Sequence, residues 1–148
     1  MKTGFVRGEQ LQRIRPFVLE SIRAVMRAVG EEVDASEYFS FIDRANTTGQ
    51  AMVIVQFDGD KPLGICVSVF RRNDVGQQYL EIVLVYNMPQ VNATVVLEKL
   101  LIPAARSLGV ELLVDRYPMV DQKENPVLGR RMRKYGFNKK AVLCERRI

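Results

Sequence analysis

The sequence predicts a single α/β domain that spans residues 1–148. Hydrophobic residues make up 47% of the chain and charged residues 26%, which is the composition of a globular protein and not of a disordered one. Apolar residues recur every three to four positions in some segments and form short continuous runs in others, which indicates helices and strands respectively. The chain has no internal repeat, low-complexity segment or linker, and its length fits one hydrophobic core.

The first third of the chain is expected to form a short strand and two helices. Residues 3–6 fit the strand, and residues 8–29 follow with apolar side chains at helical spacing. Pro16 lies inside that pattern, so we expect a kink there or a helix that starts later. A second, shorter helix should start at Ser36, whose side chain is a good N-cap.

The next segments have the short apolar runs of strands. Residues 51–57 and 63–70 flank Asp58-Gly59, which is a strong hairpin signal. Residues 79–86 form a third apolar run. The later elements are expected to be a helix at 92–108 bent at Pro103, a strand at 111–114, a helix at 126–136 and a strand at 141–145.

The composition excludes several kinds of site. The chain has no histidine, so histidine triads, histidine acid–base chemistry and histidine metal ligands are excluded. The two cysteines, Cys66 and Cys144, are too few for a cysteine-only zinc site, and we expect two reduced core thiols. No apolar run approaches the roughly 20 residues of a membrane helix, and the N-terminus lacks an apolar signal core. We therefore expect a soluble cytoplasmic protein without a metal site.

Positive charge is concentrated at the C-terminal end. Residues 130–148 hold eight Lys and Arg against one acid, while the net charge of the whole chain is +5. Such a segment could bind a phosphorylated cofactor or an acidic protein, or form a solvated helix face. No aromatic residues interleave the cluster at Arg130, Arg131, Arg133 and Lys134, so we do not expect a nucleic-acid site.

Three groups of residues carry a resemblance to a known family. The first is Lys61-Pro-Leu-Gly64, and the second is Gln90-Val-Asn-Ala-Thr-Val95. The third is Asn125 with Leu128, Met132 and Gly136-Phe137 at the same spacing as a family motif. In this order they resemble the GNAT superfamily of N-acetyltransferases. The resemblance implies a mixed, mostly antiparallel central sheet flanked by about four helices.

The resemblance also implies a binding site for acetyl-CoA. The pantetheine arm would pair with the backbone of the strand at 79–86, at Val83 and Val85, and the pyrophosphate would sit on N–H groups at the next helix N-terminus. The residues implied for the phosphates and the rest of the cofactor are Gln90, Asn92, Ala93, Thr94, Val95, Asn125 and Arg131.

The phosphate motif departs from the family pattern at its glycines. Ala93 and Val95 occupy the two small positions, and the branched side chain of Val95 adds bulk where the backbone should approach a phosphate. The alternative is an ordinary helix N-terminus capped by Asn92 or Thr94.

Catalysis would need a base, an acid and donors for a carbonyl oxygen. Glu81 is the base that the resemblance implies, because Glu81-Ile-Val-Leu-Val85 is similar to the strand that carries the catalytic glutamate in the histone-acetyltransferase branch of the family. Strict alternation would place Glu81 with Val83 and Val85 on one face, where it would be partly desolvated. The alternative is an edge or solvent-facing glutamate. Met132 replaces the family's tyrosine acid, which leaves Tyr86 and Tyr117 as candidates.

The second helix carries an aromatic group whose role the sequence leaves open. Tyr38, Phe39 and Phe41 would line the acceptor side in this family, or they would pack in the core.

Two functions remain open at this point. The first is an acetyl-CoA-dependent N-acyltransferase that transfers an acetyl group to an amine of a small molecule or a protein. The second is a catalytically degenerate GNAT-fold protein with a structural or interaction role among protein partners in a larger assembly. The order of elements and Glu81 favour the enzyme, whereas Val95, Met132 and the basic C-terminus favour the interaction protein.

Overall fold

The computed structural model describes residues 2–87 and 99–115, and the residues up to Asp115 form one compact unit. The elements follow the order β1 (Lys2–Phe5), α1 (Glu9–Arg13), α2 (Arg15–Ala28), α3 (Ala35–Thr47), β2 (Ala51–Asp58), β3 (Lys61–Arg72), β4 (Gln78–Asn87), α4 (Ile102–Ser107) and β5 (Leu113–Asp115). The helix expected at 126–136 and the strand expected at 141–145 lie outside the described residues. A single domain over 1–148 therefore stays a prediction.

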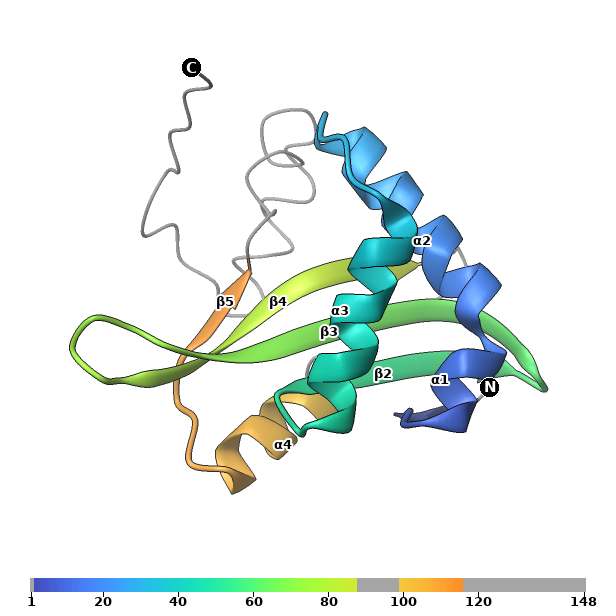
Figure 1. The fold of residues 1–148 in the computed structure, drawn as a ribbon. Helices are drawn as coiled ribbons and strands as arrows, with labels where there is room; N and C mark the ends of the chain where they lie inside the picture. Colours follow the sequence, from blue (N-terminus) through green and yellow to red (C-terminus); the bar gives the residue numbers. More distant parts are fainter. Residues whose placement is uncertain (1, 88–98, 116–148) are drawn as a thin grey trace, which may run out of the picture. The chain divides into compact units, whose positions relative to one another are not determined.

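The five strands form one mixed sheet in the order β1-β2-β3-β4-β5. The first three neighbouring pairs are antiparallel, and β4 pairs with β5 in parallel. Parallel neighbours need a crossover connection, and α4 lies in the segment that joins β4 to β5 (Figure 1). The expected mixed, mostly antiparallel sheet with about four helices is confirmed.

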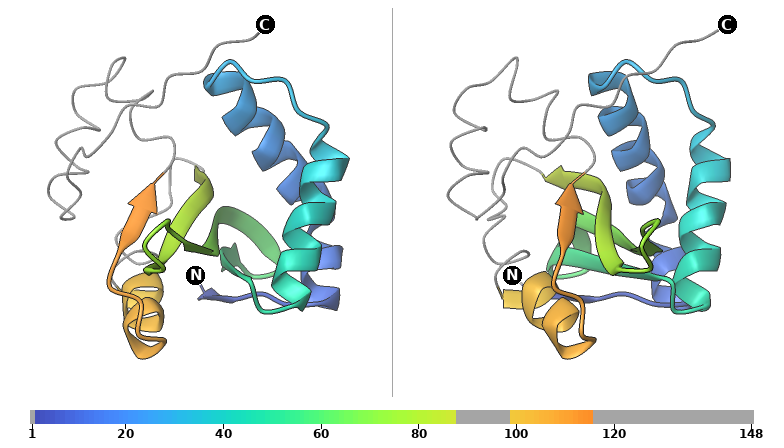
Figure 2. Two further views of the ribbon diagram at one scale, coloured as in Figure 1. Left: turned by 60° about the vertical axis from the view of Figure 1, so that its left-hand side comes forward. Right: turned by 90° about the vertical axis from the view of Figure 1, so that its left-hand side faces the viewer.

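Helices lie on both faces of the sheet. In two turned views, α2 and α3 lie on one side and α4 on the other (Figure 2). Every residue of β2 from Ala51 to Gln56 is buried, as expected for a strand that is covered on both faces. On α2 the buried Val18, Ile22 and Met26 recur at a spacing of four and face the sheet. Each such aliphatic side chain contributes about 1.5–3 kcal/mol through burial.

In the described residues, the two prolines that lie in helices, Pro16 and Pro103, occupy first turns. The chain breaks between α1 and α2 at Ile14, and Pro16 lies in the first turn of α2, where its missing N–H leaves no intrahelical bond unmade. The expected interruption at Pro16 is thus confirmed. Pro103 lies in the first turn of α4, and α4 directly follows a π-helical turn over residues 99–101. The expected helix at 92–108 is described only from residue 99 onward, where the α-helical part begins at Ile102, so the bend expected at Pro103 stays a prediction.

The N-cap of α3 is Asp34, and the expected assignment to Ser36 was wrong. Asp34 has extended backbone angles, φ −77° and ψ 110°, and its Oδ1 accepts hydrogen bonds from the N–H groups of Ser36 and Glu37 at 2.9 and 3.2 Å. Ser36 is instead the second residue of the helix, and its own N–H group is one of the two donors that Asp34 caps. The start of α3 is therefore set by Asp34.

Replacing Asp34 with alanine should destabilise the protein by about 1 kcal/mol, because two N–H groups lose their acceptor. Urea denaturation monitored by circular dichroism would measure this loss. Asp34→Asn keeps a side-chain acceptor and should lose much less, and Ser36→Ala should change stability little. An equal loss in Asp34→Ala and Ser36→Ala would contradict the assignment of the cap.

Candidate functional site

In the described part of the chain, strand β4 has strand neighbours on both sides over part of its length. It pairs there with β3 from Gln78 to Asn87, and with β5 at Leu80, Glu81 and Ile82. Within residues 2–87 and 99–115, the edge of β4 from Val83 onward therefore has no partner strand on the β5 side. Backbone N–H and C=O groups at such an edge can pair with an extended ligand.

A β-bulge lies at the point where the pairing with β5 ends. Leu84 pairs with Val67 and Ile82 pairs with Ser68, so Val83 is an extra residue with no counterpart on β3. A bulge bends its strand and increases the local twist, and bulges are frequent beside active sites. The hydroxyl of Tyr38 on α3 donates a hydrogen bond to the Val83 carbonyl oxygen at 3.2 Å. Helix α3 is thus tied to the irregular position of β4.

Glu81 is buried beside the bulge and forms an ion pair. Only 6% of the residue is exposed, and its Oε2 lies 3.2 Å from Nε of Arg71, whose side chain is 38% exposed. Its cross-strand neighbours are Val69 on β3 and Val114 on β5. The alternative of a solvent-facing glutamate is wrong. The carboxylate is buried, as expected. Any proton or water that approaches it must compete with Arg71 for its oxygens.

The expected grouping of Glu81 with Val85 on one face is wrong, and the bulge is the reason. Residues paired across neighbouring strands point to the same face. Glu81 pairs with Val69 and Val85 pairs with Cys66, and these two β3 residues are three apart, so they point to opposite faces. The extra residue Val83 shifts the alternation by one. Val85, 40% exposed, therefore lies on the face opposite Glu81.

Tyr86 lies on the same face as Glu81, under helix α2. It pairs with Ile65, four residues from Val69, and its ring meets Phe17 of α2 edge to face with a centroid distance of 6.0 Å. Four residues of an extended strand correspond to about 13 Å between backbones. Glu81 and Tyr86 therefore flank the bulge from its two sides and are not in contact along the strand.

The aromatic residues of α3 have different surroundings. Phe39 is 3% exposed and packs in the core, with the guanidinium of Arg15 5.4 Å from its ring centroid. Tyr38 is half-buried and Phe41 is 36% exposed, and their rings meet at 6.3 Å. Core packing thus describes Phe39, whereas Tyr38 reaches the sheet at Val83.

The sequence interpretation missed Arg71, and it did not connect Tyr38 with β4. A signal for Arg71 existed in the hairpin between β3 and β4. Once the turn at residues 73–76 pairs Arg71 with Tyr79, the next position on the same face of β4 is Glu81. No comparable local signal links Tyr38 to Val83, which is 45 residues away.

Most of the expected cofactor residues lie outside the described residues. They are Gln90, Asn92, Ala93, Thr94, Val95, Asn125 and Arg131, together with the candidate acid Tyr117. Within residues 2–87 and 99–115, His, Cys, Asp and Glu side chains form no group of three or more that could hold a metal ion. In the same part of the chain, no helix combines the length and apolar character needed to cross a membrane.

No protein-family model matches the sequence, and no curated protein matches it. Solved structures do match the fold. A predicted acetyltransferase from Clostridium acetobutylicum, solved with acetyl-CoA, superimposes with a TM-score of 0.70 at 12% identity, covering 99% of this chain and 96% of its own. An aminoglycoside 6'-N-acetyltransferase from Acinetobacter haemolyticus superimposes with a TM-score of 0.69 at 13% identity, covering 100% and 99%.

A third similar structure names the fold. A GCN5-related N-acetyltransferase from Ralstonia eutropha superimposes with a TM-score of 0.66 at 13% identity, covering 98% of this chain and 97% of its own. These TM-scores establish that the fold is shared, at sequence identities of 12–13%. The protein therefore has the fold of the GNAT acetyltransferases.

Proposed function

We propose that the protein is an acetyl-CoA-dependent N-acyltransferase that transfers an acetyl group to an amine. The observation that carries the proposal is β4, which is bulged at Val83 and has no described strand partner on its β5 side beyond Ile82. The pantetheine arm of acetyl-CoA is extended and has two amides, so it fits an open strand edge. The phosphates would be held by Gln90 and residues 92–95, with Asn125 and Arg131.

The chain's own residues supply the remaining chemistry in this proposal. Bound acetyl-CoA supplies an activated thioester. Glu81 accepts the proton of the acceptor amine through a water, since its carboxylate is buried two residues from the bulge. A backbone N–H of β4 beside the bulge donates to the carbonyl oxygen as negative charge develops there. Tyr86 or Tyr117 returns a proton to the departing thiolate.

The acceptor is an amine of a small molecule or of a protein. Similar structures include an aminoglycoside acetyltransferase and a ribosomal-protein-alanine N-acetyltransferase, so the fold accommodates both classes. We propose that this chain works in the cytoplasm. The second candidate function, a GNAT-fold interaction protein with protein partners, is favoured by Ala93 and Val95 at the small positions of the phosphate motif.

Calorimetric titration with acetyl-CoA and with CoA tests the proposal. We expect a Kd in the micromolar range for both ligands, which corresponds to about −8 kcal/mol of binding free energy. An acceptor screen that follows thiol release would then identify the amine. The absence of binding at millimolar ligand would reject the enzyme and favour the interaction protein.

Replacing Val95 with glycine should strengthen CoA binding by about tenfold, because a residue without Cβ lets the backbone approach the pyrophosphate. The same calorimetric titration measures the change. Val75→Gly is a matched control, because Val75 is 86% exposed at the tip of the β3–β4 hairpin and should leave the affinity unchanged. An unchanged or weaker affinity in Val95→Gly would show that no phosphate binds beside residue 95.

A further inference from the structure

The bulge at Val83 creates a local requirement for a hydrogen-bond donor. A regular antiparallel ladder satisfies strand carbonyls with N–H groups of the neighbouring strand. At a bulge the extra residue leaves this ladder, and among residues 2–87 and 99–115 the pairing of β4 with β5 ends at Ile82, one residue before Val83. A buried carbonyl without a donor is unfavourable, so another element must supply one. Only 2% of Val83 is exposed, so this position is buried.

Tyr38 supplies that donor from a helix on the face of the sheet. Its hydroxyl lies 3.2 Å from the Val83 carbonyl oxygen. The ring is held from a second side, since it meets Phe41 edge to face at 6.3 Å with an interplanar angle of 73°. Helix α3 is itself anchored by the fully buried Ile42 one turn further on. The hydroxyl is therefore presented by a rigid element.

The hydrogen bond from Tyr38 to the Val83 carbonyl oxygen also fixes the direction of the Leu84 N–H group. The peptide unit between Val83 and Leu84 is planar and trans, so the Val83 carbonyl and the Leu84 N–H point in opposite directions. A hydrogen bond that fixes the oxygen consequently fixes the direction of the N–H. Donors that are oriented before the reaction stabilise developing charge without reorganising.

We infer that Tyr38 is a positioning residue, which holds the peptide group at the β4 bulge in the orientation that recognises the acyl group of acetyl-CoA. This inference rests on the proposed function and adds a residue from α3 to it. Tyr38 acts through the backbone of Val83 and need not touch the reacting atoms. The two α3 side chains beside it in sequence, Glu37 and Phe39, point elsewhere, since Glu37 is exposed and Phe39 is in the core.

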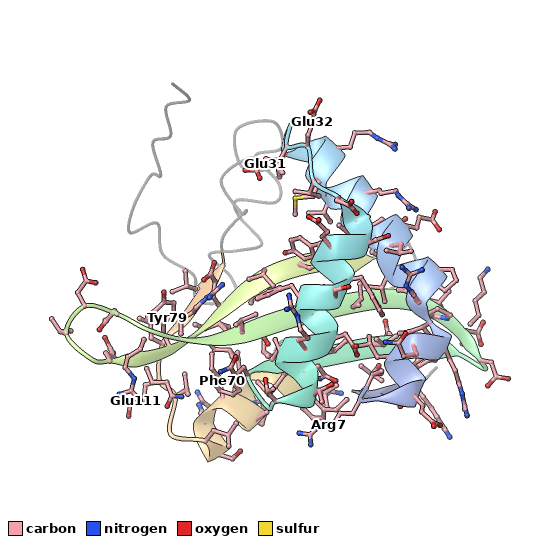
Figure 3. All side chains as sticks on the ribbon, viewed as in Figure 1. Arg7, Glu31, Glu32, Phe70, Tyr79 and Glu111 are labelled. Atoms are coloured by element: carbon pink, nitrogen blue, oxygen red, sulfur yellow. The ribbon has the colours of Figure 1, made fainter. Side chains whose placement is uncertain are left out.

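The test compares two ligands in two tyrosine variants. Tyr38→Phe keeps the ring contact with Phe41 and removes only the hydroxyl. Tyr79→Phe is the matched control, because Tyr79 is also half-buried and lies toward the hairpin end of β4, away from α3 (Figure 3). Calorimetric titration of each protein with acetyl-CoA and with CoA gives the ratio of the two affinities. Amide hydrogen exchange of Val83 and Leu84 reports the local backbone without any ligand.

We expect Tyr38→Phe to reduce the acetyl-CoA to CoA affinity ratio by about tenfold, or about 1.4 kcal/mol. We also expect exchange at Val83 and Leu84 to accelerate by about tenfold, with Val53 on β2 unchanged. Tyr79→Phe should alter neither quantity. A wild-type protein that binds acetyl-CoA, together with an unchanged ratio or unchanged exchange in Tyr38→Phe, would overturn this inference alone. A wild-type protein that binds neither ligand would overturn the proposed function, and the inference with it.

Discussion

Replacing Glu81 with glutamine should lower the rate of acetyl transfer by about 10²–10⁴-fold, because the buried carboxylate is the proposed general base and an amide cannot accept the amine proton. The affinity for acetyl-CoA should stay nearly unchanged, since glutamine keeps the length and polarity of the side chain. Steady-state kinetics and calorimetry on the same preparation separate the two effects. An unchanged rate in a folded Glu81→Gln protein would remove Glu81 from the mechanism.

The ion pair with Arg71 supplies the control for this experiment. Glu81→Gln leaves the guanidinium, 38% exposed, without its carboxylate, and we expect about 1–3 kcal/mol of destabilisation. Arg71→Gln breaks the same pair and leaves the buried carboxylate without its partner, so it should be destabilised at least as much as Glu81→Gln and still retain most of the turnover. If Arg71→Gln lost as much activity as Glu81→Gln, the role of Glu81 would be structural. The double variant then measures how strongly the two residues are coupled.

Much of the fold follows from local signals in the sequence. The apolar runs on either side of Asp58-Gly59 became the antiparallel pair β2 and β3, because a two-residue turn with glycine fits a tight hairpin. Gly59 has a positive φ of 60°, a conformation that glycine adopts without strain. The interruption at Pro16 also followed from the chemistry of one residue. Such features depend on a few neighbouring residues, which the sequence displays directly.

The error about the face of Val85 concerns a feature that depends on distant partners. Glu-Ile-Val-Leu-Val, residues 81–85, reads as a regular alternating strand, and no glycine marks the bulge. Only the pairing of Val67 with Leu84 and of Ser68 with Ile82 reveals that Val83 is extra. The wrong N-cap assignment for α3 has another cause. Asp34 and Ser36 are both good capping residues, and only the backbone conformation distinguishes them.

The position of a functional site on β4 stays a prediction of the resemblance to acetyltransferases. The structure places two of the expected residues, Glu81 and Tyr86, on one face of this strand. The resemblance could not show that Arg71 pairs with Glu81 or that Tyr38 contacts Val83, because those contacts depend on register and on helix packing. The same bulge that caused the error about Val85 is the feature on which the proposed function depends.

Deleting Val83 should abolish acetyl-CoA binding at accessible concentrations, a loss of at least about 100-fold, while the protein still folds. Because Val83 has no counterpart on β3, its removal makes the pairs Val67–Leu84 and Ser68–Ile82 consecutive and leaves every other pair in register. A strand without a bulge loses the local bend and twist, which changes the direction of its backbone groups beyond Ile82. The carbonyl that Tyr38 binds is lost at the same time.

Val83→Ala is the matched control for the deletion, because it removes most of the buried side chain and keeps the bulge. Both changes should cost about 2 kcal/mol, since the valine is 2% exposed. Urea denaturation should therefore show similar stability for the two proteins, whereas calorimetry should show acetyl-CoA binding only in Val83→Ala. Equal binding by the two proteins would mean that an ordinary strand edge is sufficient for the cofactor. Loss of binding in the deletion alone would assign cofactor recognition to the backbone geometry of the bulge, independently of the side chain that occupies it.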